Sequence, residues 1–340
     1  MTPKRIDLHQ HFFPAGALGA DLLHRVEDDT GWRFPPENFP WSPEKNLRFM
    51  DELGIETAIL SLTGSPGGDG VGPANREFAR LLNTTAHQAV IDHPGRFGFF
   101  ANVPIPSDTE AALEELAYAL DVLGAVGVNL TSSYGKGDQA RYVGHDAFDP
   151  IWEELDRRGT VVFIHGDQTP GSNRPPNRLV PIPVGEVPNE TYKAAADLVT
   201  RAKKRRYANV RIVLSHSGGS TPFLASRAAV LAHCVGGELS PEEMIEDFRD
   251  FHYETALSGF ETNLVALENF VKPDHILFGS DFPAVDLATA AWFTRNVDAY
   301  FVDRPQELEA VMRSNALALF PQLGAHASAG SATLPDPAER

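Results

Sequence analysis

Residues 5–11 read Arg5-Ile6-Asp7-Leu8-His9-Gln10-His11, and this stretch decides the fold that we expect for the rest of the chain. Its apolar and β-branched residues predict a strand. Because side chains alternate along a strand, His9 and His11 should point to the same side, which is the interior if the strand belongs to a barrel. Two imidazoles two residues apart at the end of a strand can both bind one metal ion. We therefore expect a metal-binding first strand.

Further short apolar segments follow and alternate with amphipathic ones. The expected strands are 5–11, 57–63, 97–103, 127–132, 161–166, 210–215, 252–257 and 276–280. A helix start is expected at Ser42-Pro43-Glu44, and further helices over 108–123, 148–158, 191–206 and 261–271. Eight strands that alternate with helices predict parallel βαβ units in a (β/α)8, or TIM, barrel of the metal-dependent hydrolase type.

Two long interruptions follow the first and fifth expected strands. Residues 12–41 are rich in Pro and aromatic side chains, and residues 167–189 are rich in Pro. Both follow carboxyl ends of strands, where barrel enzymes carry their active-site loops, although decoration of the barrel rim is the alternative. We expect one barrel domain over residues 1–320 and a disordered tail over 321–340, where Ala, Ser, Gly and Pro dominate.

Three more polar residues end expected strands. His165 follows an apolar run that begins at Val161, and His216 follows another, before the glycine pair Gly218-Gly219. Asp281 ends the last strand, where an unpaired carboxylate would be costly to bury. All these residues lie, like His9 and His11, at the ends of expected strands. We therefore predict one divalent ion, bound by His9, His11, His165 and Asp281. Such a donor set suits Zn²⁺ best, with Mn²⁺ as the alternative.

Composition limits the classes of partner. The chain has 340 residues and a formal charge of −17, which argues against nucleic acid as a ligand. The basic run Lys203–Arg206 is expected to be the solvated end of a helix. One cysteine, Cys234, excludes an intrachain disulfide and favours a reducing, cytoplasmic location. No segment is apolar and long enough for a signal peptide or a membrane span.

Together these motifs resemble a known family. Asp7 to Pro14, His165, His216-Ser217-Gly218-Gly219 and Gly279-Ser280-Asp281-Phe282-Pro283 are similar to the motifs of the amidohydrolase-related decarboxylases, a family that includes aminocarboxymuconate semialdehyde and 6-methylsalicylate decarboxylases. The similarity runs in motif order from about residue 5 to residue 320. Two-metal relatives commonly have a modified Lys on strand four, and this chain has none there, which favours a single ion.

The resemblance implies further roles for particular residues. His216 or Asp281 would handle the proton that replaces CO2. Arg227, eleven residues after His216, would reach the neighbouring subunit's site and bind the substrate carboxylate, which implies a homodimer. Arg48, on the first helix, would have a companion role in substrate binding, and a charge on the helix surface is the alternative. The chain departs from the family's usual residues at two substrate positions. One is the segment Gly166-Asp167-Gln168 that follows His165, and the other is Ser217.

The resulting prediction is a metal-dependent decarboxylase of a hydroxylated aromatic or muconate-like acid. A hydrolase of a lactone or amide is the first alternative, since the same metal could activate a water molecule. A barrel used only for binding is the second alternative, and the intact set of metal ligands argues against it.

Overall fold

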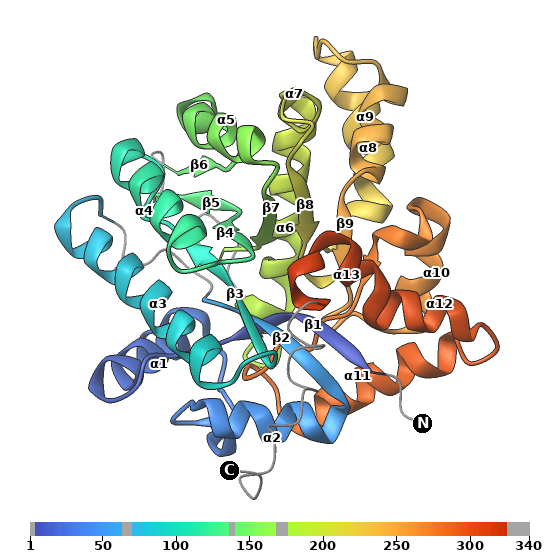
Figure 1. Cartoon of the computed structure of the whole chain (residues 1–340). Helices are drawn as coiled ribbons and strands as arrows, with labels where there is room; N and C mark the ends of the chain where they lie inside the picture. Colours follow the sequence, from blue (N-terminus) through green and yellow to red (C-terminus); the bar gives the residue numbers. More distant parts are fainter. Residues whose placement is uncertain (1–3, 63–69, 136–139, 168–175, 325–340) are drawn as a thin grey trace, which may run out of the picture.

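Eight parallel strands form the centre of the molecule. The computed structural model describes residues 4–62, 70–135, 140–167 and 176–324. Within them, one sheet has the order β1-β2-β3-β4-β7-β8-β9-β10, and Figure 1 shows helices on its outside. The strands are β1 Arg5–His11, β2 Ile55–Ser61, β3 Phe97–Asn102, β4 Gly127–Thr131, β7 Val161–His165, β8 Arg211–Leu214, β9 His252–Glu254 and β10 Ile276–Leu277. These are the eight expected strands, with boundaries that differ by a few residues.

Hydrogen bonds between the first and last strands close the barrel. The Leu8 amide donates to the Phe278 carbonyl at 3.0 Å, and the Asp281 amide donates to the His9 carbonyl at 2.8 Å. The His11 amide donates to the Phe282 carbonyl at 2.6 Å. The predicted TIM barrel is therefore confirmed. Closure also brings Asp281, at the end of the chain's last strand, next to the histidines of the first strand.

Helices surround the strands and connect them. They are α1 Ala17–Thr30, α2 Pro43–Leu53, α3 Pro73–Asp92, α4 Thr109–Asp121, α5 Asp149–Arg158, α6 Ile182–Thr200, α7 Lys203–Arg206, α8 Thr221–Cys234, α9 Pro241–Arg249, α10 Glu261–Phe270, α11 Leu287–Tyr300, α12 Pro305–Glu309 and α13 Asn315–Leu319. A short antiparallel pair, β5 Ser133–Tyr134 and β6 Arg141–Tyr142, adds to the β4–α5 connection. As predicted, Ser42 caps α2, and its hydroxyl accepts a hydrogen bond from the Lys45 amide.

The C-terminal segment packs against the barrel. Leu319, Phe320 and Leu323 belong to a buried apolar cluster with barrel residues such as Ile6 and Phe100. In Figure 1, α13 lies in front of the strands. Most of the expected tail, residues 325–340, lies outside the described residues.

The segment 12–41 contains regular structure that the sequence analysis did not expect. It forms α1 and a short 3-10 helix, η1, at Pro36–Asn38. Leu18, Leu22 and Val26 do have helical spacing in the sequence, a signal that the sequence analysis did not use. Side-chain hydrogen bonds attach the segment to the loop after β10: Trp32 Nε1 donates to Ala284 O at 2.9 Å, and Asn38 Nδ2 donates to Val285 O at 3.0 Å.

The second interruption, 167–189, is also partly helical. Helix α6 begins at Ile182, nine residues before the predicted start at Thr191, and includes Pro188 in its interior. Residues 168–175 lie outside the described residues. The predicted helix 191–206 is divided, because Ala202 adopts a left-handed conformation with φ 55° before α7.

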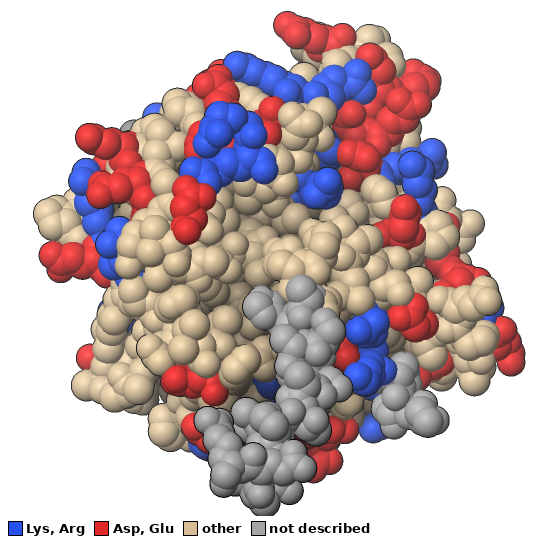
Figure 2. All heavy atoms as spheres, in the orientation of Figure 1, with Lys and Arg blue, Asp and Glu red and all other residues tan. Residues whose placement is uncertain are grey.

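The basic run Lys203–Arg206 is only partly the solvated helix end that we expected, because Arg206 is exposed whereas Lys203 and Lys204 are buried. Lys203 and Lys204 are 3% and 4% exposed. Lys203 Nζ pairs with Asp146 and Asp149, and Lys204 pairs with Asp250. Figure 2 shows basic and acidic side chains side by side over α5, α7 and α9. The run therefore joins neighbouring helices through ion pairs.

Candidate metal centre

A change of strand register directs both histidines of β1 into the barrel. Leu8 belongs to the same apolar cluster as Phe163, and the His9 ring centre lies 5.1 Å from that of Phe163. Adjacent residues on a regular strand would point to opposite sides. The pairing of β1 with β2 shifts between Asp7 and Gln10, which is the behaviour of a β-bulge. His9 and His11 share a side that faces the interior, as predicted, and the bulge lets them do so although Leu8 also belongs to the core.

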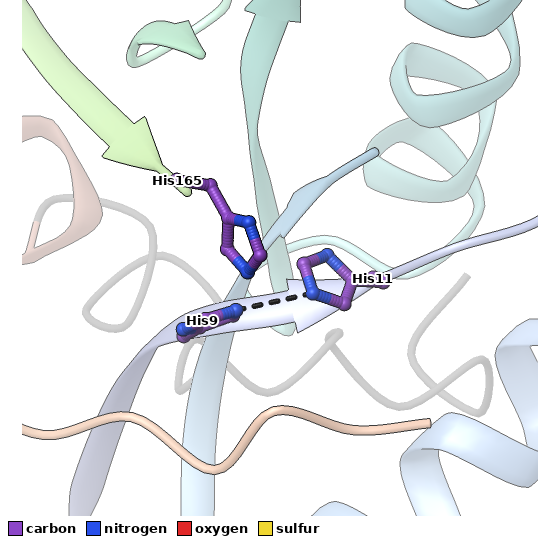
Figure 3. Close-up of side chains that lie close together, drawn as sticks. All are labelled: His9, His11 and His165. Atoms are coloured by element: carbon purple, nitrogen blue, oxygen red, sulfur yellow. Dashed lines mark hydrogen bonds between the residues drawn. The ribbon is translucent and has the colours of Figure 1, made fainter. Parts of the chain in front are cut away.

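Five side chains from four strand ends meet at one point. His9 Nε2 lies 3.1 Å from His11 Nε2, and both rings and that of His165, from the end of β7, face one another in Figure 3. His165 Nε2 lies 3.3 Å from His216 Nε2. Asp281 Oδ1 lies 3.1 Å from His11 Nε2 and 3.4 Å from His9 Nε2. All five residues are buried, and the predicted grouping of these side chains is present.

The donor atoms are spaced as metal ligands are. Those of His9, His11 and His165 lie within 4.8 Å of one another, as do those of His9, His216 and Asp281. Zinc–nitrogen bonds of about 2.0–2.1 Å place tetrahedral donors about 3.3 Å apart, close to the distances observed. Neutral imidazole nitrogens and a carboxylate oxygen also match the donors that divalent transition metals prefer. The residues present therefore fit a divalent ion.

Backbone contacts fix which ring nitrogen faces the cluster. His165 Nδ1 lies 2.8 Å from Gly166 O, and His216 Nδ1 lies 3.1 Å from Ala256 O. A carbonyl accepts only, so each Nδ1 keeps its proton and each Nε2 presents a lone pair. Such outer contacts set the orientation of metal-binding histidines.

Two buried carboxylates beside the cluster were missed by the sequence analysis. Glu254, at the end of β9, lies 2.8 Å from His9 Nδ1. Asp7 accepts hydrogen bonds from the backbone amides of His9 at 3.0 Å and Ser280 at 3.1 Å. Asp7 was noted only as part of a motif. The sequence analysis expected this strand to run from 252 to 257, so Glu254 did not fall at a strand end as Asp281 did, and the same argument did not reach it.

Burial and charge shift the pKa values in opposite directions. Burial lowers the pKa of His165 well below its usual range, and it also lowers the pKa values of His11 and His216. For His9, burial acts downward, but the negative charges of Glu254 and Asp281 raise its pKa to about 9. Burial acts upward on the pKa of Asp281, and the nearby His9 and His11 lower it overall. The cluster thus concentrates negative charge around His9, which favours a cation there.

An apolar cavity opens above the cluster. It has a volume of about 290 Å³, and His11, His165, His216 and Asp281 form one end of it. The other described lining residues are mainly apolar: Phe13, Val26, Trp32, Phe34, Leu62, Pro183, Val184, Val187, Pro188, Leu257, Ala284, Val285 and Phe293, with the hydroxyls of Thr30, Ser258 and Thr289. No Lys or Arg occurs among the described residues that line it. Such a site suits a small, largely apolar ligand with one polar edge.

Comparison with known proteins decides the family. The model of the amidohydrolase family matches residues 6–322. The chain belongs to this family. It is 40% identical over 326 residues to a 6-methylsalicylic acid decarboxylase of Aspergillus aculeatus, a match that covers 94% of this chain and 96% of the relative. It is 28% identical to a gamma-resorcylate decarboxylase of a Rhizobium species, with 94% and 99% covered. The predicted resemblance to decarboxylases of the family is therefore confirmed.

Solved structures agree on the fold. A dihydroxybenzoic acid decarboxylase from Polaromonas, crystallised with manganese and the inhibitor 2-nitroresorcinol, superposes with a TM-score of 0.80 at 22% identity. That match covers 94% of this chain and 97% of the other. At this identity the likeness speaks for the shared amidohydrolase barrel.

The two predicted substrate-binding arginines lie outside the cavity of their own chain. Arg48 is exposed on α2, whereas Asn46 of the same helix is buried and donates to Gln10 at 2.9 Å. Positions two apart on a helix point to nearly opposite faces, so Arg48 faces away from the barrel. Its exposed position agrees with the alternative of a helix-surface charge, and its role in substrate binding stays a prediction. Arg227 is exposed on α8. Its predicted role, binding the substrate in a neighbouring subunit, requires a second subunit.

Proposed function

We propose that this amidohydrolase-family protein is a metal-dependent decarboxylase whose substrate is a hydroxylated benzoic acid with an apolar ring substituent, of the 6-methylsalicylate type. The observation that carries the proposal is an apolar cavity that ends at a cluster of His and Asp side chains. The 40% identity to a 6-methylsalicylic acid decarboxylase supports it.

The cavity wall favours an aromatic acid over a muconate-like one. A muconate-like acid carries polar groups along its length, and most of the described wall offers them no hydrogen-bond partner. A buried polar group without a partner costs about 1–3 kcal/mol. A benzoic acid gathers its carboxylate and hydroxyl at one edge of the ring, which can face the cluster while the rest of the ring contacts apolar side chains.

We assign one divalent ion to His9, His11, His165 and Asp281. A bound ion there would supply a positive charge that holds the substrate carboxylate or the neighbouring oxygen. Zn²⁺ fits three imidazoles and a carboxylate. Mn²⁺ is the alternative, and the manganese in the Polaromonas enzyme supports it. Two equivalents of metal would contradict this assignment.

His216 is the residue that we assign to proton transfer, with Asp281 as the second candidate. Loss of CO2 breaks the bond between the ring and the carboxyl carbon, and the electron pair of that bond must take up a proton at the ring carbon. His216 lines the cavity; its Nε2 lies 3.3 Å from His165 Nε2, while its Nδ1 is held by Ala256 O. Nε2 is thus the nitrogen that can exchange a proton with the substrate. Asp281 has a lowered pKa, so as a carboxylate it is better suited to binding a cation.

A homodimer is part of the proposal, with Arg227 in the partner's site. Helix α8 exposes apolar side chains beside Arg227: Phe223, Val230 and Leu231 are 60%, 45% and 46% exposed. Apolar area of this kind is typical of a surface that another protein covers. An arginine from outside would provide the cation that the described cavity lining lacks.

A cytoplasmic location also stays a proposal, supported by the single cysteine. None of the helices in the described ranges has the length and apolar character that crossing a membrane requires.

Carbon dioxide release tests the proposed reaction. Protein loaded with Zn²⁺ or Mn²⁺ is incubated with 6-methylsalicylate, salicylate and 2,6-dihydroxybenzoate, and CO2 and the corresponding phenol are measured. We expect equal amounts of both products and the highest kcat/KM for 6-methylsalicylate. His9→Ala, which should lose both metal and turnover, is the control. Consumption of water in a lactone or amide hydrolysis, with no CO2 from any of the acids, would contradict the proposal.

A further inference from the structure

We infer that Glu254 is a positioning residue, whose one carboxylate orients both a metal-binding histidine and the proton-transfer histidine. The inference rests on the proposed function for the roles of His9 and His216. Glu254 lies at the end of β9 and is fully buried, at 0% exposure. It does not line the cavity, so any action on the substrate must pass through its neighbours.

The first of these neighbours is the imidazole of His9. Glu254 Oε1 lies 2.8 Å from His9 Nδ1. A carboxylate accepts this hydrogen bond, so the proton stays on Nδ1 and His9 Nε2 offers its lone pair toward His11 and Asp281. Removing such a partner typically lowers metal affinity by about 10–100-fold.

The second neighbour is the turn that carries His216. The His216 amide donates to Glu254 Oε1 at 2.6 Å, and the Ala256 amide donates to Oε2 at 2.6 Å. Ala256 in turn holds the ring, because its carbonyl lies 3.1 Å from His216 Nδ1. One carboxylate therefore fixes the backbone of His216 directly and its ring through Ala256. His216 needs such support, since its φ of 54° lies in a region that residues other than glycine rarely adopt.

The surroundings of Glu254 leave it little freedom. Among the described residues, its hydrogen-bond partners are His9 and two backbone amides, with no Lys or Arg. A divalent ion bound beyond His9 would balance the charge of this buried carboxylate. Gly279 leaves room for it: a Cβ at that position would lie 2.1 Å from Glu254 Oε2.

Metal affinity tests the action on His9. Glu254→Gln keeps the size, but one end of its amide is a donor, so at least one of the three N–H groups loses its acceptor. Apo-protein is titrated with Zn²⁺ and with Mn²⁺ in competition with a chromophoric chelator. We expect a 10–100-fold loss of affinity. Glu115→Gln is the matched control: Glu115 is a buried carboxylate on α4 that accepts from Arg80 and Asn83 and does not touch the cluster.

A double-mutant comparison tests the action on His216. At saturating metal, Glu254→Gln should lower kcat by about 10-fold or more in the parent protein but have little further effect in a His216→Asn background, because residues that act through one another are not additive. An equal loss of kcat in the parent protein and in His216→Asn would overturn the part of the inference that concerns His216. Unchanged metal affinity in Glu254→Gln would overturn the part concerning His9.

The two measurements, metal affinity and kcat, also distinguish a failure of this inference from a failure of the proposed reaction. Metal affinity requires no turnover, so its loss in Glu254→Gln would stand even if no benzoic acid is decarboxylated. If Glu254→Gln does not fold, Glu254→Asp, which keeps both acceptor oxygens on a shorter side chain, is measured in the same way. Parental metal affinity and kcat in Glu254→Asp would then overturn the inference.

Discussion

At the scale of single residues, the site is built on unfavourable backbone conformations. His216, Leu257 and Asp281 have φ values of 54°, 49° and 66°, and all three line the cavity. Residues other than glycine rarely adopt positive φ, and those that do are concentrated at functional sites. Tertiary hydrogen bonds hold these conformations, for example the one from the Asp281 amide to the His9 carbonyl at 2.8 Å.

His216→Asn separates proton transfer from metal binding. Asparagine tolerates positive φ, so the turn should keep its shape. We expect the variant to retain about one equivalent of metal and to lose on the order of 100-fold or more in kcat, which is the usual contribution of a positioned acid–base group. Metal analysis and steady-state kinetics on the same preparation measure both. A variant that purifies without metal would make His216 a ligand instead.

His252→Phe probes the pH dependence of stability away from the metal centre. The His252 ring stacks on that of His275 with centres 4.3 Å apart, and burial lowers the pKa of His252 from 6.5 to about 3. Neutral His252 contributes its full stability above pH 6.5, and the contribution falls as the pH drops toward 3. Between pH 7 and pH 5 the parent should lose about 2 kcal/mol more unfolding free energy than His252→Phe. Urea unfolding at the two pH values measures this difference, and equal losses would refute the prediction.

At the scale of elements, helix α6 fits against the loops that carry His165 and His216. A Cβ on Gly166 would lie 1.9 Å from the Val187 carbonyl oxygen, and one on Gly219 would lie 1.8 Å from that of Pro188. Pro188 interrupts the hydrogen bonding of α6, which costs an isolated helix about 3 kcal/mol. Close packing against the strand ends offsets this cost and places Val187 and Pro188 in the cavity wall.

Gly219→Ala should disrupt this fit. The new methyl group would overlap the Pro188 carbonyl, and the φ of 58° is unfavourable for alanine, so we expect about 3 kcal/mol of destabilisation. Gly185→Ala is the control on α6, where a Cβ would meet nothing within 4 Å and alanine should stabilise the helix by about 0.5–1 kcal/mol. Unfolding midpoints compare the two. Similar effects for both variants would show that contact between α6 and the turn is unimportant.

At the scale of the whole molecule, the cavity and the surface of α8 complement each other. The described cavity lining has no Lys or Arg, whereas α8 exposes Arg227 among apolar side chains. In the proposed homodimer, Arg227 of one subunit would supply the cation that the cavity lining of the other subunit lacks. A dimer would also cover Val230 and Leu231, which otherwise remain in contact with water.

Subunit mixing tests the shared site. Arg227→Ala and His9→Ala should each have little activity. A mixed dimer, however, contains one site with His9 from one chain and Arg227 from the other, so activity should return to about a quarter of the parent value if subunits exchange at random. Native mass spectrometry verifies exchange. Mixed dimers without activity would mean that Arg227 serves no site in the partner.

The sequence by itself determined the barrel and most of the cluster. Strand periodicity is local, and parallel strands place their carboxyl ends together, so polar residues at those ends could be predicted to meet. His9, His11, His165, His216 and Asp281 followed from this rule. Glu254 ends β9 in the structure, but the expected strand continued to residue 257, so the rule did not single it out.

Only the tertiary structure decided the rest. The bulge between Asp7 and Gln10 turns His9 inward, and it depends on pairing with β2. The early start of α6 and the burial of Lys203 and Lys204 depend on partners far away in the chain. The packing of Asn46 against Gln10 fixes the rotation of α2 and turns Arg48 to the solvent, which the sequence position alone does not show. Local patterns specify which elements form, whereas rotation, register and burial are set by contacts between elements, which periodicity does not contain.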